Sequence, residues 1–253
     1  MTAEILKKNF SLLKTHHPNA YDALIGIHRS QDYEVSLSQS GHPTLVHIDS
    51  KGTKRYLLSK YDPLNEAERL VKSLNVSDHT NFIVFGMGLG YPTIELIKII
   101  PDYSKIIVIE KDRELARLAF ETTDFSRILL HSGLTFVFPN EIEEIATQLE
   151  AEKFNLCLNG YCFVQQNALS EVNKNKNNEI FSEVKNFIQA STIELKTQKA
   201  KSKIFYNNIA KNINNLISSA GINSLKLALS DVPAIICSAG PALETGVAST
   251  SER

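Results

Sequence analysis

The sequence predicts an α/β protein built on a Rossmann-like, mainly parallel sheet, with a small α+β subdomain before it and a helical linker after it. Two apolar runs of strand length, at residues 82–85 and 106–109, are separated by a glycine-rich turn and a segment with helical spacing. Further apolar runs then alternate with amphipathic segments as far as residue 158. This alternation is typical of a doubly wound parallel sheet, which binds ligands at the carboxyl ends of its strands.

Residues 1–75 are expected to form the small α+β subdomain. Residues 2–14 have the spacing of an amphipathic helix, which Pro18 helps to end. Three short strands separated by turn-forming residues then predict a β-meander. These strands are expected at residues 33–37, 44–48 and 55–58. After them, Asp62 can cap a helix that Pro63 opens.

The most informative stretch is the glycine turn after residue 85. Gly86, Gly88 and Gly90 alternate with larger residues where a strand runs into a helix, and Pro92 suits the first turn of that helix. Glycines at such a junction let backbone N–H groups approach an anionic or ribose-bearing ligand at a helix N-terminus. The three glycines and Tyr91 are therefore candidate residues for binding a nucleotide or an S-adenosylmethionine-like ligand, although the glycines could serve close packing alone.

Glu110 is the candidate acid of the same site. It ends the second apolar strand, 24 positions after Gly86. A carboxylate at a similar offset, roughly 20 residues, accepts hydrogen bonds from ribose hydroxyls in nucleotide-binding βαβ units. Tyr61 lies just before the helix that Asp62 caps, so that helix could form a wall of the pocket or be no more than a well-capped helix.

The Rossmann-like domain is expected to span residues 76–165. Its remaining elements are expected as a helix at 113–120, a strand at 134–138, a helix at 141–150 and a strand at 154–158. Asn159 follows the last of these strands, which makes it a candidate for the pocket edge.

Residues 166–228 have helical patterning and are expected to form a linker. Residues 229–253 are predicted to form the first strand and turn of a second α/β domain. Only 13 residues follow Gly240, too few for the crossover that a parallel strand requires. We therefore expect that second domain to be truncated, with Gly240 and Pro241 as the remaining part of a phosphate-contacting turn.

Composition excludes several classes of protein. The formal charge of −1 and the hydrophobic share of 43% indicate an ordinary globular chain without a polyanion partner, so no nucleic-acid binding is expected. No apolar run reaches the roughly 18 residues of a membrane span and no signal-peptide pattern opens the chain, which predicts a cytoplasmic protein without membrane contact. Three cysteines without paired spacing predict neither disulfides nor a metal site.

Five blocks in order resemble the motility accessory factor family, whose members are also known as 6-hydroxymethylpterin diphosphokinase MptE-like proteins. The blocks are Lys60-Tyr61-Asp62-Pro63 with Glu66-Ala67, residues 84–91, Val108-Ile109-Glu110, Asn208 with Asn212, and Pro233-Ala234-Ile235-Ile236 through Gly240-Pro241-Ala242-Leu243. The resemblance covers roughly residues 30–245.

The resemblance implies a glycosyltransferase that moves a nonulosonic acid, of the pseudaminic or legionaminic type, from its CMP-activated form to Ser or Thr of flagellin. Flagellin and the CMP-activated sugar would be the partners of the complete protein, which could also form a homo-oligomer. The transferase domain of the family opens with the turn that contains Gly240, and Ala242 stands where the family usually has Ser. The 253 residues would therefore be the N-terminal portion, inactive as a transferase and without an assigned catalytic residue.

Three other functions stay open at this point. An S-adenosylmethionine-dependent methyltransferase has a similar turn, but such enzymes usually place an acid two positions before the first glycine, where this chain has Val84. A pterin diphosphokinase would need acids arranged around Mg²⁺, and no such pair follows Gly240. A non-enzymatic module that binds flagellin or joins protomers is the third possibility.

Overall fold

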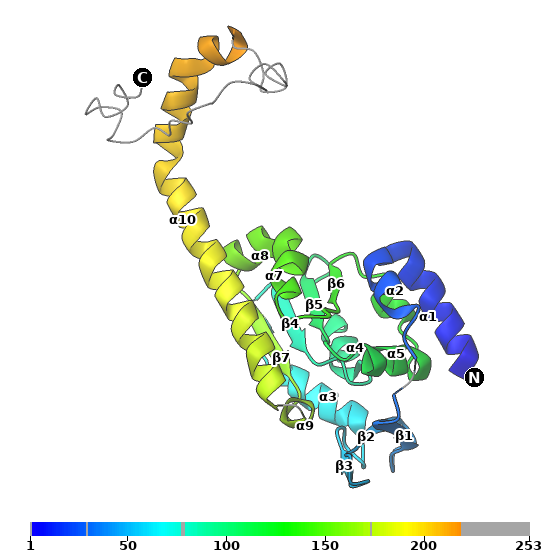
Figure 1. The fold of residues 1–253 in the computed structure, drawn as a ribbon. Coiled ribbons are helices and arrows are strands. Elements are labelled where there is room, and N and C mark those ends of the chain that lie inside the picture. The colour runs from blue at the N-terminus through cyan, green and yellow to red at the C-terminus, as the bar shows by residue number, and fades with distance from the viewer. Residues whose placement is uncertain (1, 29, 77–78, 173, 219–253) are drawn as a thin grey trace, which may run out of the picture. The chain divides into compact units, whose positions relative to one another are not determined.

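The computed structural model describes residues 2–28, 30–76, 79–172 and 174–218 (Figure 1). The chain divides into two compact units, residues 1–196 and 197–253. The helices, strands and cavity discussed below belong to the first unit, except where the second is named. The domain boundaries expected from the sequence at residues 75, 165 and 228 stay predictions.

Two helices open the chain. Helix α1 (Thr2–His16) is confirmed and extends two residues beyond its predicted end, but Pro18 begins a second helix, α2 (Pro18–Leu24), which the sequence pattern does not predict. Proline suits that position because the first turn of a helix needs no N–H donor. The buried side chain of Asn9 donates to the carbonyl oxygens of Phe120 and Thr123, both at 2.8 Å, and so fixes α1 to the main body.

The predicted β-meander and the capped helix after it are confirmed. The strands are β1 (Tyr33–Leu37), β2 (Pro43–Ile48) and β3 (Lys54–Tyr56), paired antiparallel in the order β1-β2-β3. Helix α3 (Pro63–Lys72) follows, and the Asp62 carboxylate accepts the backbone N–H of Asn65 at 3.0 Å.

The central sheet has four parallel strands in the order β6-β5-β4-β7. They are β4 (Asn81–Phe85), β5 (Lys105–Ile109), β6 (Leu134–Val137) and β7 (Cys162–Gln165). The chain first adds strands on one side of β4 and then places β7 on the other side. The predicted Rossmann-like fold is thus confirmed, and the carboxyl ends of β4 and β7 form the switch point at which such sheets bind ligands.

Helices cover both faces of this sheet (Figure 1). The helices that follow β4 in the chain are α4 (Tyr91–Ile97), α5 (Arg113–Thr122), α6 (Ser126–Leu129), α7 (Glu144–Leu149), the 3₁₀ helix η2 (Glu150–Glu152), α8 (Lys153–Leu158), α9 (Asn167–Glu171) and α10 (Lys174–Ser218). Phe82 and Val84 belong to the core that α1, α2, α4 and α5 share, whereas Ile83 and Phe85 belong to the core with α7, α8 and α10. Successive side chains of a strand point to opposite faces, so β4 is apolar throughout.

The strand expected at residues 154–158 is wrong, because those residues form helix α8. Leu156 is buried, whereas Phe154 and Leu158 are 60% and 72% exposed. A helix places residues four apart on one face, which here leaves that pair outward and turns Leu156 inward. The fourth strand of the sheet is β7, four residues further along the chain.

The helical patterning predicted after residue 165 is confirmed as far as residue 218. The first half of α10 packs on the sheet through Ile180, Val184, Phe187 and Ile188, which are all buried. Within the second unit, residues 197–218 of the same helix carry exposed apolar side chains. The strand and turn predicted at 229–253 lie outside the described residues.

Candidate functional site

The glycine turn has the backbone form that only glycine adopts easily. Gly86, Gly88 and Gly90 have φ values of 76°, 53° and 80°, in the left-handed region where a side chain costs roughly 1–2 kcal/mol. Gly90 stands at the N-terminus of α4, and its N–H donates to the Met87 carbonyl at 2.8 Å. The turn therefore carries the chain sharply from β4 into α4.

Glu110 joins the second strand to this turn, as the sequence analysis expected. Its Oε2 accepts the Met87 N–H at 2.8 Å, and its Oε1 accepts the Asp112 N–H at 2.9 Å. Burial raises the pKa of Glu110 from 4.5 to about 7, although the N–H groups of Met87 and Asp112 act in the opposite direction. Each carboxylate oxygen keeps a lone pair for a further donor.

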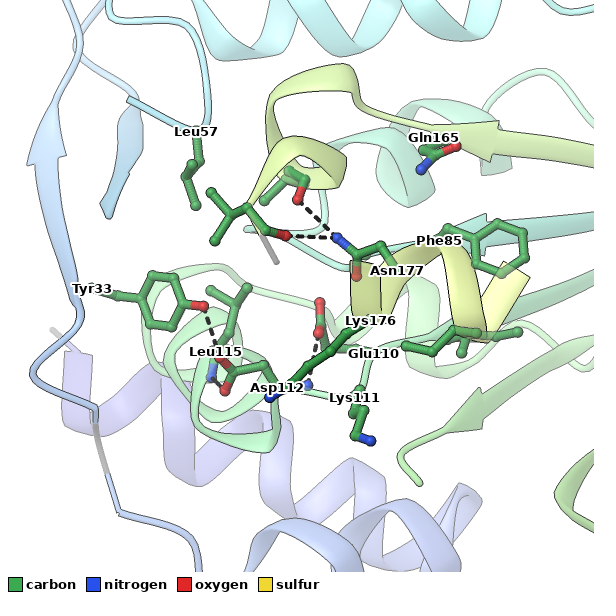
Figure 2. A pocket seen from close by; sticks show the side chains of 15 residues that line it. Tyr33, Leu57, Phe85, Glu110, Lys111, Asp112, Leu115, Gln165, Lys176 and Asn177 are labelled. Atoms are coloured by element: carbon green, nitrogen blue, oxygen red, sulfur yellow. Dashed lines mark hydrogen bonds between the residues drawn. The ribbon is translucent and has the colours of Figure 1, made fainter. Parts of the chain in front are cut away.

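A cavity of about 240 Å³ opens beside Glu110 at the carboxyl ends of β4, β5 and β7 (Figure 2). Seven of the residues that line it are apolar and one is a glycine. The others have a carboxylate, amide, ammonium or phenol group. The wall consists of Tyr33, Leu57, Phe85, Gly86, Ile109, Glu110, Lys111, Asp112, Leu115, Gln165, Leu169, Val172, Lys176, Asn177 and Ile180. An apolar wall with a few polar groups is typical of a small-molecule site.

Tyr33 and Asp112 form one polar pair in this wall (Figure 2). The Tyr33 hydroxyl donates to Asp112 Oδ2 at 2.7 Å, and Asp112 Oδ1 accepts the N–H groups of Glu114 and Leu115 at the start of α5. Burial, and then the charge of Asp112, raise the pKa of Tyr33 far above its ordinary value. Tyr33 thus stays a hydrogen-bond donor at physiological pH.

Leu169 of α9 lies directly over the glycine turn. A methyl group placed on Gly88 would lie 2.9 Å from Leu169 Cδ1, and one on Gly86 would lie 3.7 Å from Leu169 Cβ. The side-chain amide of Asn177 donates to the carbonyl oxygens of Leu169 and Val172 (Figure 2). The end of α9 is therefore fastened to the start of α10, with Leu169 filling the space next to the glycines.

The structure brings only part of the predicted set to the cavity. Gly86 and Glu110 line it, while Gly88 lies behind Leu169. Gly90 contacts Phe125, and a methyl group at position 90 would lie 2.2 Å from that ring. The buried Tyr91 donates its hydroxyl to the Pro43 carbonyl at 2.8 Å and so connects α4 to the β-meander.

Tyr61, Asn159 and the C-terminal turn lie apart from the cavity. Tyr61 is 56% exposed and lines a different hollow, along α3. Asn159 ends a helix and not a strand, and the carbonyl of the next residue, Gly160, accepts the side chain of Asn81, the first residue of β4. Asn159 therefore lies at the opposite edge of the sheet. Gly240 and Pro241 are outside the described residues.

Several residues of the cavity wall are not predicted from the sequence. Asp112 carried a usable signal, because an Asp before an amphipathic run is typical of a helix N-cap. Tyr33, Leu169 and Lys176 come from elements distant in the chain, and no local pattern places them at one cavity.

Neither a metal site nor a membrane-spanning helix is present among the described residues. They contain no group of three or more His, Cys, Asp or Glu side chains that could hold a metal ion. Among the helices they form, none combines the length and the apolar character needed to cross a membrane.

The fold and the cavity together define the class of this protein: a Rossmann-like α/β protein with a small pocket at its switch point. No protein-family model and no curated protein matches the chain. Among solved structures, the chain is similar to the MAf glycosyltransferase from Magnetospirillum magneticum AMB-1, with a TM-score of 0.52 and 14% identity. The likeness covers 76% of this chain and 35% of that protein, so the chain spans about a third of its length. At this identity the likeness concerns the fold.

Proposed function

We propose that the described region is the ligand-binding module of a glycosyltransferase that modifies flagellin. The similarity of fold to a MAf glycosyltransferase supports a glycosyltransferase-like role in general. The ordered sequence blocks that resemble motility accessory factors support the finer proposal. In it, the complete protein takes a nonulosonic acid from its CMP-activated form and transfers it to flagellin, while the module described here carries no transferase chemistry.

The observation that carries the proposed ligand is the position of Glu110. A buried carboxylate at the end of β5 faces a glycine turn at the end of β4 and lines a cavity, an arrangement suited to ribose hydroxyl groups. A volume of about 240 Å³ is below the usual range for drug-sized ligands. It therefore favours a nucleoside over a dinucleotide.

Isothermal titration of the full chain with ribonucleosides tests the proposed ligand. We expect saturable binding of at least one of adenosine, cytidine, guanosine and uridine, and roughly tenfold weaker binding of its 2′-deoxy form, because the hydrogen bond from the 2′-hydroxyl to the Glu110 carboxylate is lost. S-adenosylmethionine is titrated in parallel. Tight binding of S-adenosylmethionine alone would support the methyltransferase alternative, and equal affinity for ribo and deoxy forms would overturn the role of Glu110.

The mass of flagellin tests the proposed reaction. Flagellin from cells that carry the gene for the complete protein should be heavier than flagellin from cells in which that gene is deleted, by whole multiples of a nonulosonic acid residue. Flagellin of unchanged mass would contradict the proposal. This result is independent of the nucleoside titration.

A second candidate function, self-association, is favoured by the exposed apolar side chains of the second unit. Ile204, Phe205, Ile209, Ile213 and Ile217 are each about half exposed or more. Light scattering after gel filtration would test this candidate. A dimer that Ile209→Glu and Ile213→Glu dissociate would support it, and a monomer at high concentration would exclude it.

A further inference from the structure

Gln166 is a buried amide whose polar atoms have no partner among the described residues. It is only 5% exposed, and neither Oε1 nor Nε2 makes a hydrogen bond there. It stands at the N-cap position of α9, yet its side chain does not cap that helix. Leaving such a group unpaired costs roughly 1–3 kcal/mol, and few buried groups in native proteins remain so.

The amide lies beside the glycine turn, at the carboxyl end of β7. A methyl group on Gly88 would lie 3.5 Å from Gln166 Oε1 and 2.9 Å from Leu169 Cδ1. Leu169 also lines the cavity, whereas Gln166 does not. The leucine therefore stands between the unpaired amide and the space that Glu110 faces.

Three neighbouring strands set the distance between the two polar groups. Glu110 follows β5 and Gln166 follows β7, and β4 with its glycine turn lies between these strands. Adjacent strands are about 4.8 Å apart, so the two strand ends are about 10 Å apart. A ligand held by both groups must extend across the glycine turn, as a nucleoside can and a single sugar ring cannot.

We propose that the ligand site continues beneath Leu169 to the amide of Gln166, which pairs with the hydrogen-bonding edge of a nucleobase. This inference rests on the proposed function, since it assumes that a ribonucleoside enters the cavity. The amide offers one donor group and one acceptor, the combination that reads a base edge. Binding then requires Leu169 to move away from the glycines, so the described state is the closed form of the site.

The replacement Gln166→Met in the full chain tests this subsite, because methionine keeps the length of glutamine and removes both polar atoms. We expect the thermal midpoint to stay equal or rise, since an unpaired buried amide is lost. We also expect the best-bound ribonucleoside to bind about tenfold more weakly, for the loss of two hydrogen bonds. Gln39→Met, at an exposed position before β2, is the control and should change neither quantity.

The replacement Leu169→Ala tests the closed form. The ligand no longer has to displace a large side chain, so the same ribonucleoside should bind several-fold more tightly than to the unmodified chain. Leu118→Ala is the control, because Leu118 is buried in the same core cluster but does not line the cavity. Unchanged affinity in Leu169→Ala, or an equal gain in Leu118→Ala, would contradict displacement of Leu169.

The outcomes separate this inference from the proposed function. If the unmodified chain binds no ribonucleoside, the proposed ligand and the subsite both fail. If it binds with preference for the ribo form and Gln166→Met binds equally well, only the subsite is overturned. A clear loss of thermal stability in Gln166→Met would show that the amide is paired within the fold, and that also overturns the subsite, whatever the titrations give.

Discussion

At the scale of single residues, Glu110 is the group whose chemistry depends most on its position. Two backbone N–H groups hold its carboxylate at the glycine turn, and burial raises its pKa to about 7. Near neutral pH the side chain thus exists in both protonation states. Only the ionised form keeps a free lone pair on both oxygens for ribose hydroxyls, so ribonucleoside affinity should rise as pH increases through about 7.

The raised pKa of Glu110 also predicts a pH dependence of stability. The folded protein holds this proton more tightly than the unfolded chain, so the group's stabilising contribution is complete below about 4.5 and is lost as pH rises to about 7. Over this pH range the free energy of unfolding should fall by an amount on the order of 3 kcal/mol. Denaturant unfolding between pH 4.5 and 8 should show this decrease, and Glu110→Gln should flatten it. An equal slope in both proteins would contradict the assignment.

Gly90 is the glycine of the turn that allows the Phe125 ring to pack against the backbone. Gly90→Ala should destabilise the fold by more than 2 kcal/mol, because the residue has φ of 80° and the new methyl would overlap the Phe125 ring. Gly41→Ala is the control, with φ of 82° and open space around it, and should cost only about 1 kcal/mol. Chemical denaturation measures both values, and equal losses would show that the Phe125 contact contributes nothing.

At the scale of elements, the cap of α3 is a local feature that the sequence already indicates. Asp62→Ala removes the acceptor of the Asn65 N–H and should lower the free energy of unfolding by about 1 kcal/mol. Asp22→Ala, at an exposed position within α2, should change it by less than about 0.5 kcal/mol. Urea denaturation of both variants checks the difference, and equal values would contradict the capping role.

The sequence predicts most elements because their signals are local. Alternation and turn residues locate β1 and β2, and glycine after an apolar run locates β4. The wrong prediction of a strand where the structure has helix α8 has a different cause. Apolar residues at 154, 156 and 158 have the spacing of a half-buried strand, but only Leu156 is buried. The true strand β7 is four residues long and follows Gly160, too short for its pattern to be distinctive.

The candidate site was predicted less completely than the fold. Gly86 and Glu110 were predictable because they end adjacent strands, whose carboxyl ends meet at one edge of the sheet. Tyr33, Leu169 and Asn177 reach the cavity only through tertiary packing of the β-meander, α9 and α10. Sequence spacing also could not separate glycines that face a ligand from Gly90, which faces Phe125.

At the scale of the whole first unit, two tyrosine hydroxyls connect the β-meander to the α/β sheet. Tyr33 on β1 bonds Asp112 before α5, and Tyr91 on α4 bonds Pro43 on β2. These links hold the meander over one wall of the cavity. The cavity therefore needs both the β-meander and the α/β sheet, although the sequence predicts each of these two parts separately.

The double replacement Tyr33→Phe with Tyr91→Phe should loosen the β-meander without unfolding the sheet. Each lost hydrogen bond costs about 1 kcal/mol, and more where the acceptor is charged. Hydrogen exchange should accelerate for the amides of β1 and β2 and stay slow for those of β4 and β5. Tyr103→Phe, at an exposed position, serves as the control. Equal acceleration in both sheets would contradict this account.

The central claim is that the cavity beside Glu110 binds a ribonucleoside through its sugar hydroxyls. Amide NMR of the full chain during titration with a ribonucleoside tests it most directly, because the N–H groups of Met87 and Asp112 donate to the Glu110 carboxylate. We predict that both signals shift to saturation with the ribonucleoside and much less with its 2′,3′-dideoxy form. Shifts confined to other parts of the chain, or identical shifts with both compounds, would contradict the claim.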